Sequence, residues 1–215
     1  MALAAFDDND PFRKRVLVAV FSQSLKGGCT ASSLAGELSF SEEKAAELLA
    51  ALADASLVGA DGSGGVSLTE RGRGSIKVVL AGGVFDVIHA GHIYTLGRAK
   101  ALGDALVVSV ARDSTVGRVR SRPTINDERV RAAQVGAVKG VDAAILGSER
   151  DIFDTVERVR PDVIVIGYDQ KHGEDEMKAR AKERGVDVTV VRLDTVHPGL
   201  KSSSIKDDPR FGGQL

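Results

Sequence analysis

The chain of 215 residues lacks tryptophan, holds one cysteine and takes only 4% of its residues from the aromatic types. Because Cys29 has no second thiol in the chain to pair with, an internal disulfide is excluded, which is typical of a reducing compartment such as the cytoplasm. No apolar run approaches the roughly 20 residues that a membrane-spanning helix requires. Residues 1–8 also have no basic region of the kind that begins a secretory signal. We therefore expect a cytoplasmic protein that does not act at a membrane.

The chain also lacks a large excess of charge of either sign, since its formal net charge is −1 at pH 7. Residues 1–74 hold seven basic and ten acidic residues, and the remainder holds 22 basic and 20 acidic residues. Neither part has the basic excess of a protein whose main partner is a nucleic-acid backbone. The hydrophobic fraction of 43%, in contrast, supports a sizeable buried core.

Residues 10–74 show the pattern of three helices followed by a hairpin. Each predicted helix starts at a residue type that commonly caps helix N-termini, namely Asp10 before Pro11, Thr30 and Ser41. Apolar side chains recur at three- and four-residue spacing after these caps. A glycine-rich tip at residues 61–65 then separates two short apolar segments, as in a hairpin. This element order resembles a winged helix-turn-helix domain, and we assign residues 1–74 to it as a small α+β domain.

The third predicted helix would read DNA if this were a DNA-binding domain. Lys44 is its one basic residue, and its exposed positions are acidic: Glu42, Glu43, Glu47 and Asp54. Carboxylates are repelled by the phosphates that line a groove. An accessory or dimerisation module, compatible with a homo-oligomer, is therefore favoured over DNA binding, which stays the alternative. Residues 69–75, with charges and two glycines, are interpreted as a linker.

From Ile76 onward, apolar segments of strand length alternate with helical patterns. The expected strands are residues 76–81, 105–110, 143–146, 163–166 and 186–191. The expected helices cover 93–102 and lie near 127–138, 152–159 and 175–184. This alternation predicts an α/β domain over residues 75–215, with a Rossmann-like, doubly wound parallel sheet of five strands. If the strand order is 3-2-1-4-5, a ligand crevice lies between the first and fourth strands.

The first expected strand leads into Gly82-Gly83, and a helix is expected to begin near Gly91-His92. A glycine turn lets backbone N–H groups approach a phosphate, and the start of a helix adds positive potential. His89 and His92 bracket the turn, so both imidazoles can donate hydrogen bonds to phosphate oxygens, which gain charge during displacement at an α-phosphorus. A pair of metal ligands, or two polar residues at a helix start, are the alternative interpretations. The spacing lacks the glutamate and third ligand of a metallohydrolase helix.

The whole segment Gly82-Gly83-Val84-Phe85-Asp86-Val87-Ile88-His89-Ala90-Gly91-His92 resembles the motif Gly-Thr-Phe-Asp-x-x-His-x-Gly-His of the cytidylyltransferase-like nucleotidyltransferases. The resemblance covers residues 76–206. It implies direct transfer of a nucleotidyl group to a phosphorylated acceptor, with release of pyrophosphate. It also implies a divalent metal cation, Mg²⁺ or similar, as cofactor. Val84 departs from the motif, because threonine is usual at that position, and any contact of the threonine hydroxyl is lost.

The resemblance also assigns roles to residues. His89 and His92 become the catalytic residues. The nucleotide-binding residues are expected in the motif and in three later segments: Val84, Phe85, His89, Ala90, Gly91, His92, Arg129, Asp169, Ser202 and Ser203. No residue is assigned as a metal ligand.

The later segments carry less specific patterns. Asp127-Glu128-Arg129 resembles the family's Glu-Arg, whose arginine holds the β- and γ-phosphates, and Ser202-Ser203-Ser204 resembles a late Ser/Thr run that cradles phosphates. Ordinary helix-surface charge and a serine-rich linker are the competing interpretations. The arginine that the cytidylyltransferase branch has upstream of that run is missing, and Val196-His197 lies there instead. After the second expected strand, every other residue is an arginine: Arg118, Arg120 and Arg122. In an extended chain these side chains would point the same way. They could contact a triphosphate, or the segment could be a solvated surface loop.

Three segments are more similar to the archaeal FAD synthases than to other branches of the family: residues 111–116, 147–149 and 167–170. This similarity implies FMN as acceptor and ATP as donor, with FAD and pyrophosphate as products. Asp169, after the fourth strand, is expected to contact a ribose or base, unless its loop is only a polar turn. A glycerol-3-phosphate cytidylyltransferase is the second enzyme hypothesis. A winged-helix transcription regulator with a nucleotide-sensing domain is the alternative from another class.

Overall fold

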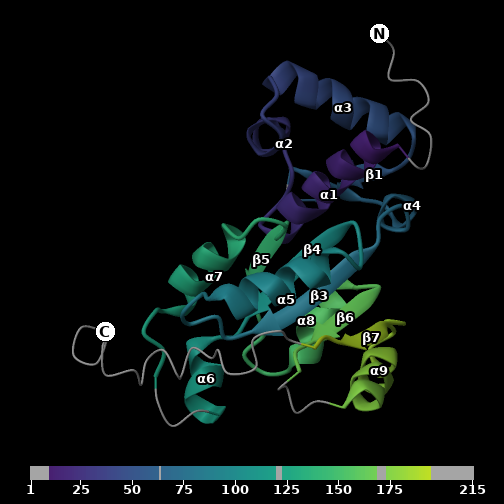
Figure 1. Ribbon diagram of the computed structural model, residues 1–215. Helices are drawn as coiled ribbons and strands as arrows, with labels where there is room; N and C mark the ends of the chain where they lie inside the picture. Colours follow the sequence, from purple (N-terminus) through teal and green to yellow (C-terminus); the bar gives the residue numbers. More distant parts are fainter. Residues whose placement is uncertain (1–9, 63, 120–122, 169–172, 195–215) are drawn as a thin grey trace. The chain divides into compact units, whose positions relative to one another are not determined.

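A computed structural model of the chain describes residues 10–62, 64–119, 123–168 and 173–194 (Figure 1). The chain divides into two compact units, residues 1–77 and residues 78–215. Within the described ranges, none of the helices combines the length and the apolar character that crossing a bilayer demands.

The described residues of the first unit form three long helices, a two-stranded hairpin and a short fourth helix. Their bounds are α1 (Pro11–Leu25), α2 (Ala31–Leu38), α3 (Glu42–Asp54), β1 (Val58–Ala60), β2 (Val66–Leu68) and α4 (Glu70–Arg73) (Figure 1). The predicted caps are confirmed, because the side chains of Asp10, Thr30 and Ser41 accept hydrogen bonds from backbone N–H groups in the first turns of α1, α2 and α3. The winged helix-turn-helix resemblance rests on this element order and stays a prediction.

The core of the first unit lies between its three long helices. Leu17, Leu34 and Leu48, one from each helix, are buried. Cys29, between α1 and α2 in the sequence, is also buried and forms a β-bridge with Val66. Burial raises the pKa of its thiol. A thiol with a raised pKa is a poor nucleophile at neutral pH, so Cys29 is a core side chain.

The segment that was expected to be a linker, residues 69–75, instead contains the helical turn α4. The Thr69 hydroxyl caps this turn by accepting a hydrogen bond of 3.1 Å from the N–H of Gly72. Gly72 lies so close to the hairpin that a Cβ atom there would be 2.0 Å from the carbonyl oxygen of Leu57. The linker prediction is wrong because this glycine permits a close backbone contact, and the segment belongs to the first unit.

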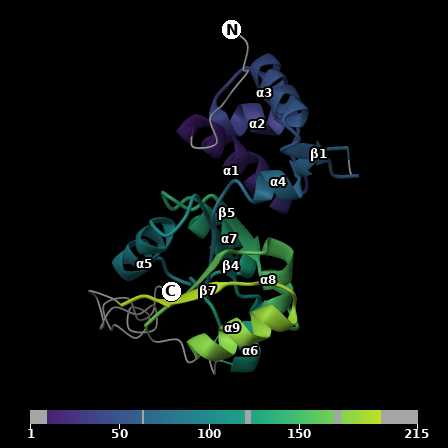
Figure 2. The same cartoon turned by 90° about the vertical axis from the view of Figure 1, so that its right-hand side faces the viewer.

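The second unit is a parallel sheet flanked by helices (Figures 1 and 2). Its described elements are β3 (Val78–Gly83), α5 (Ala90–Lys100), β4 (Ala105–Val110), α6 (Asp113–Val119), α7 (Glu128–Gly136), β5 (Ala143–Leu146), α8 (Ile152–Val159), β6 (Val163–Ile166), α9 (Glu174–Glu183) and β7 (Thr189–Arg192). Neighbouring strands pair in parallel in the order β5-β4-β3-β6-β7. Numbered from the start of this unit, that order is 3-2-1-4-5, so the five-stranded doubly wound sheet is confirmed, although its last strand begins later than predicted.

Helices cover both faces of the sheet. On one face, Leu96 of α5 and Val135 of α7 join side chains of the central strands, such as Leu106 and Val165, in one buried cluster. Helices α8 and α9 lie on the side opposite α5 (Figure 2). Because β3, β4 and β6 are covered on both faces, each contains four consecutive apolar residues, at positions 78–81, 105–108 and 163–166, which is why they could be predicted.

Candidate active site

The loop between β3 and α5 begins at the carboxyl end of the central strand. Gly82 and Gly83, predicted as a turn, are instead the last residues of β3 and pair with β4. A side chain at position 83 would crowd Phe85, because a Cβ atom there would lie 2.9 Å from the buried ring of Phe85. Phe85 has a φ of 54°, in the left-handed region, and turns the chain out of the strand direction. The prediction of a turn at the two glycines is therefore wrong, and the turn lies at Phe85.

His89 and His92 lie at the start of α5. His89 is the N-cap residue, in an extended conformation, and His92 is in the first turn. Their imidazole rings are stacked, with centroids 3.9 Å apart and an interplanar angle of 25°. The centroid of the Phe85 ring is 5.1 Å from that of His92. Both imidazoles are partly exposed at the positive end of the helix, where an anion is stabilised.

The histidine pair has no further protein ligands around it for a metal ion, as far as the described residues extend. Among them, no group of three or more His, Cys, Asp or Glu side chains is arranged to hold a metal. Protein zinc sites use at least three such ligands. Mg²⁺, in contrast, often takes most of its ligands from substrate phosphates and water. A cation bound in that way needs few ligands from the protein.

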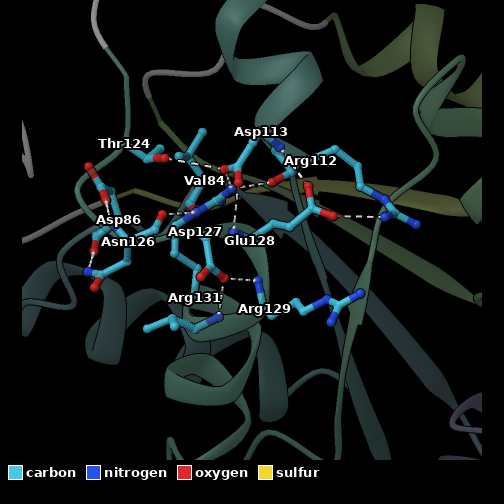
Figure 3. Close-up of polar contacts among 12 residues, drawn as sticks. Val84, Asp86, Arg112, Asp113, Thr124, Asn126, Asp127, Glu128, Arg129 and Arg131 are labelled. Atoms are coloured by element: carbon cyan, nitrogen blue, oxygen red, sulfur yellow. Dashed lines mark hydrogen bonds and ion pairs between the residues drawn. The ribbon is translucent and has the colours of Figure 1, made fainter.

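Asp86, in the middle of the loop, is 1% exposed and contacts the segment that precedes α7. Its Oδ1 atom accepts hydrogen bonds from the backbone N–H groups of Ile125 at 2.8 Å and Asn126 at 3.1 Å. The side-chain amide of Asn126 donates to the carbonyl oxygen of Asp86 at 2.9 Å (Figure 3). These reciprocal hydrogen bonds hold the histidine-bearing loop against the segment before α7.

Arg131, in α7, is the largest fully buried side chain among the described residues. Its guanidinium donates to three backbone carbonyl oxygens, those of Val84 at 2.6 Å, Ala111 at 2.8 Å and Asn126 at 3.1 Å. It also pairs with the Asp113 carboxylate at 2.6 Å (Figure 3). These acceptors compensate the loss of water around a buried charge. Arg131 thereby contacts the loop after β3, the loop after β4 and the segment before α7 at once.

Asp113 lies at the start of α6, between Arg131 and Glu128. Its Oδ2 atom accepts the N–H of Glu128 at 3.1 Å, while its own N–H donates to Oε2 of Glu128 at 2.8 Å. Arg112 forms an ion pair of 2.8 Å with the other carboxylate oxygen of Glu128. Burial alone would raise the pKa of Asp113, but the hydrogen bonds from Arg131 and Glu128 hold that pKa below its ordinary value of 3.8. Asp113 is therefore ionised at neutral pH and faces Arg131 as a charge.

A family model described as cytidylyltransferase-like matches residues 80–207, from within β3 to beyond β7. The chain belongs to this family. The match includes the loop after β3 and both histidines, so the family predicted from the motif is confirmed. The first unit lies before the matched residues.

Curated relatives of this chain carry one recurring description. A FAD synthase of Aciduliprofundum boonei is 51% identical over 115 residues, which cover 54% of this chain and 76% of the relative. A FAD synthase of Thermoplasma volcanium is 48% identical over 126 residues, covering 59% of this chain and 88% of the relative. A crystal structure described as the lipopolysaccharide core biosynthesis protein of Thermoplasma volcanium GSS1 is 47% identical. It matches with a TM-score of 0.54 over 56% of this chain and 98% of that one.

The residues of the cytidylyltransferase-like motif lie together around the start of α5. Val84 is half-buried, and Phe85 is buried. Ala90 is exposed and Gly91 is buried in the first turn of the helix. Because the carbonyl oxygen of Val84 accepts a hydrogen bond from Arg131, the position of this peptide group depends on α7. The roles of these residues in nucleotide binding stay predictions.

Two predicted phosphate-binding arginines lie on helices. Arg129 is exposed in the first turn of α7, and its side chain takes no part in the contacts drawn around Arg131 (Figure 3). Arg118 is in α6 and donates to the Thr115 hydroxyl and to the carbonyl oxygen of Glu149. The prediction of an extended chain is therefore wrong at Arg118, because the helix α6 begins at Asp113, shortly after β4 ends. The other two members of that pattern, Arg120 and Arg122, lie outside the described residues.

Three more predicted nucleotide-binding residues, Asp169, Ser202 and Ser203, lie outside the described residues, as do Val196 and His197. The described segment after β6 reaches Tyr168, which is 38% exposed. Since β6 and β3 are parallel neighbours, their carboxyl ends meet where the strand order reverses. The segment at Gly167-Tyr168 and the loop at Val84 therefore start from the same edge of the sheet, which is where such sheets bind ligands.

Sequence reasoning missed Arg131, Asp113 and the contact between Asp86 and Asn126. A signal for Arg131 was present in the spacing of α7. Positions 131, 135 and 138 have helical spacing, and Val135 and Val138 are apolar, so Arg131 shares their inward face. Arg129 does not fall on that face, although it follows the glutamate that resembles the family pattern.

Proposed function

We propose that this protein is a FAD synthase, which transfers AMP from ATP to FMN and releases pyrophosphate. The observation that carries the proposal is the stacked pair of His89 and His92 at the start of α5, on the sheet edge where ligands bind. The acceptor and donor follow from the relatives. Relatives described as FAD synthases are 42–51% identical to this chain, and 76% or more of the length of the two relatives described above is covered.

The reaction forms one bond and breaks one. A phosphate oxygen of FMN attacks the α-phosphorus of ATP, and the bond from that phosphorus to the bridging oxygen of pyrophosphate breaks. Negative charge increases on the non-bridging oxygens of the α-phosphate and on the departing pyrophosphate. The protein therefore has to supply fixed hydrogen-bond donors and positive potential, and it needs no nucleophile of its own.

His89 and His92 are proposed to be those donors. With ring centroids 3.9 Å apart, the two imidazoles can reach oxygens of the same or neighbouring phosphate groups. The N-terminus of α5 adds positive potential at the same point. The proposed nucleotide contacts of the loop, of the helix start and of the later segments are those predicted from the sequence: Val84, Phe85, Ala90, Gly91, Arg129, Asp169, Ser202 and Ser203.

We propose that the divalent cation binds with the triphosphate. The absence of a three-ligand group among the described residues supports this arrangement, as does the preference of Mg²⁺ for phosphate and water ligands. Bound there, the cation would neutralise charge on the triphosphate and the leaving pyrophosphate.

The first unit is proposed to be an accessory or dimerisation module of a cytoplasmic protein. The helix that would read DNA, α3, exposes Glu42, Glu43 and Glu47. Its one lysine, Lys44, forms an exposed ion pair of 2.7 Å with Glu47, which partly offsets that charge. This acidic surface disfavours DNA binding.

The substrate assignment is tested by comparing donors and acceptors. The purified protein is incubated with Mg²⁺ and with either ATP or CTP, combined with either FMN or glycerol 3-phosphate, and products and pyrophosphate are quantified. We expect FAD from ATP and FMN. CTP should be the poorer donor, because polar groups matched to adenine are left unpaired by cytosine. Formation of CDP-glycerol without any FAD would refute the flavin assignment and leave nucleotidyl transfer intact.

A further inference from the structure

Arg131 is a charged side chain that the proposed chemistry does not use, yet it is fully buried next to the catalytic loop. It is 0% exposed, and four hydrogen bonds of its guanidinium are directed to other protein groups. A guanidinium has five N–H donors, so little capacity remains for a substrate. Arg131 therefore differs from Arg129, which is exposed on the same helix.

The acceptors of Arg131 come from three segments that are distant in sequence. Val84 begins the loop that carries the histidines, Ala111 and Asp113 follow β4, and Asn126 precedes α7. A buried guanidinium without its acceptors is strongly unfavourable, so displacement of any of these segments leaves charge or carbonyl groups unsatisfied. The position of the loop after β3 is consequently coupled to the positions of the other two segments.

The contact with Val84 acts on the histidines through the backbone. A hydrogen bond of 2.6 Å to its carbonyl oxygen fixes the orientation of the peptide group that joins Val84 to Phe85. Phe85 then takes its left-handed conformation, and its ring lies beside that of His92. Asp86, one residue further, is held by the N–H groups of Ile125 and Asn126. The loop thus has two fixed points ahead of His89.

We propose that Arg131 is a positioning residue for nucleotidyl transfer, which holds the histidine-bearing loop in register with the segments after β4 and before α7 without contacting the substrate. The inference rests on the proposed function only for its activity measurement. Small displacements of reacting groups reduce turnover strongly, by up to about 100-fold per ångström. The effect should therefore appear in kcat more than in substrate affinity.

The test is the conservative variant Arg131→Lys, because an ammonium group keeps the charge but cannot reach the three carbonyl oxygens together. At a temperature well below the melting transition, kcat for FAD formation should fall on the order of tenfold or more. KM for ATP should change by less than about threefold, since the residue makes no ground-state contact with ATP. The matched control is Arg184→Lys, which alters an arginine bound to Asp151 and Asp154 near α8 and should leave both constants unchanged.

A second measurement does not depend on activity. The chain has four histidines, and their imidazole Cε1–Hε1 resonances are resolved by NMR and assigned with His89→Gln and His92→Gln. Arg131→Lys should shift the resonances of the stacked pair, and Arg184→Lys should not. If the wild type makes no FAD, the proposed function fails, and these resonances still decide whether Arg131 positions the loop.

A purely structural role gives a different result. Arg131→Lys would then melt at a lower temperature but keep kcat per folded molecule and both histidine resonances, and the proposal would be overturned. If Arg131→Lys does not fold, Asp113→Asn replaces it, because that change weakens the ion pair of 2.6 Å and keeps the guanidinium. Asp113→Asn should lower kcat about threefold or more and shift the same resonances. An unchanged kcat with unchanged resonances would overturn the proposal equally.

Discussion

Gly83 and Phe85 illustrate at the residue scale how a motif position is set by its neighbour. The ring of Phe85 lies close to where a side chain on residue 83 would begin, because a Cβ atom on residue 83 would be 2.9 Å from the nearest ring atoms. Gly83→Ala should therefore lower the free energy of unfolding by about 1–3 kcal/mol, as overpacking does, measured by urea denaturation. Gly97→Ala is the control, because a Cβ atom there would have nothing within 4 Å apart from its chain neighbours and the backbone of its own helix, α5. This variant should gain up to about 1 kcal/mol of stability. Equal stability of both variants would contradict this account.

The histidines give a second prediction at this scale. His89→Ala and His92→Ala should each lower kcat about 100-fold or more, because each removes one donor aimed at charge in the transition state. Both are partly exposed, so the melting temperature should change little. Steady-state kinetics and thermal unfolding of the same preparations make the comparison. Turnover near the wild-type level in either variant would remove that histidine from the mechanism.

Asp113 is the first residue of α6, and we expect its carboxylate to make the stability of the second unit fall at low pH. Because its folded pKa lies below the ordinary 3.8, the stabilisation is present above that pH and is lost as the pH falls through the folded pKa. The effect should be modest, since the side chain is 43% exposed. Asp113→Asn should therefore lose less stability than the wild type between pH 5 and about pH 3, followed by urea denaturation at each pH. Parallel curves for the two proteins would show that Asp113 contributes nothing to acid unfolding.

Elements differ in how far their sequences reveal them. The bounds predicted for β4, β5 and β6 agree with the structure, because each strand consists mainly of consecutive apolar residues. The pairing of His89 and His92 at the start of α5 could be predicted from their spacing and from the family motif, and their catalytic role stays a prediction. The contacts of Arg131 could not, because a buried arginine is recognised only once its acceptors from three separate segments are known. The turn predicted at Gly82-Gly83 was misplaced for a similar reason. The glycine at position 83 makes room for the ring of Phe85, and the sequence alone does not reveal that contact.

The molecule as a whole consists of two units, and the family match lies entirely within the second. A chain shortened to residues 75–215 should fold and keep FAD synthesis, because the whole sheet and the histidine pair lie within it. Circular dichroism and product formation relative to the full chain measure this. A shortened chain that is folded but inactive would mean that the first unit completes the site or an obligatory oligomer. Sequence-specific DNA binding by the full chain at physiological salt would contradict the accessory role.

The central strand has a consequence for how the protein is made. β3 emerges from the ribosome first among the five strands, yet one of its two neighbours is β6, where Val79 lies opposite Val163. The backbone N–H of Val78 likewise donates to Asp162, 84 residues later. Pairings over such separations form slowly, because a long stretch of chain must be closed before any contact rewards it. During synthesis, β3 therefore keeps one unpaired edge until most of the chain has been translated. The junction of β3 and β6, beside which the histidine-bearing loop starts, is among the last parts of the second unit to form.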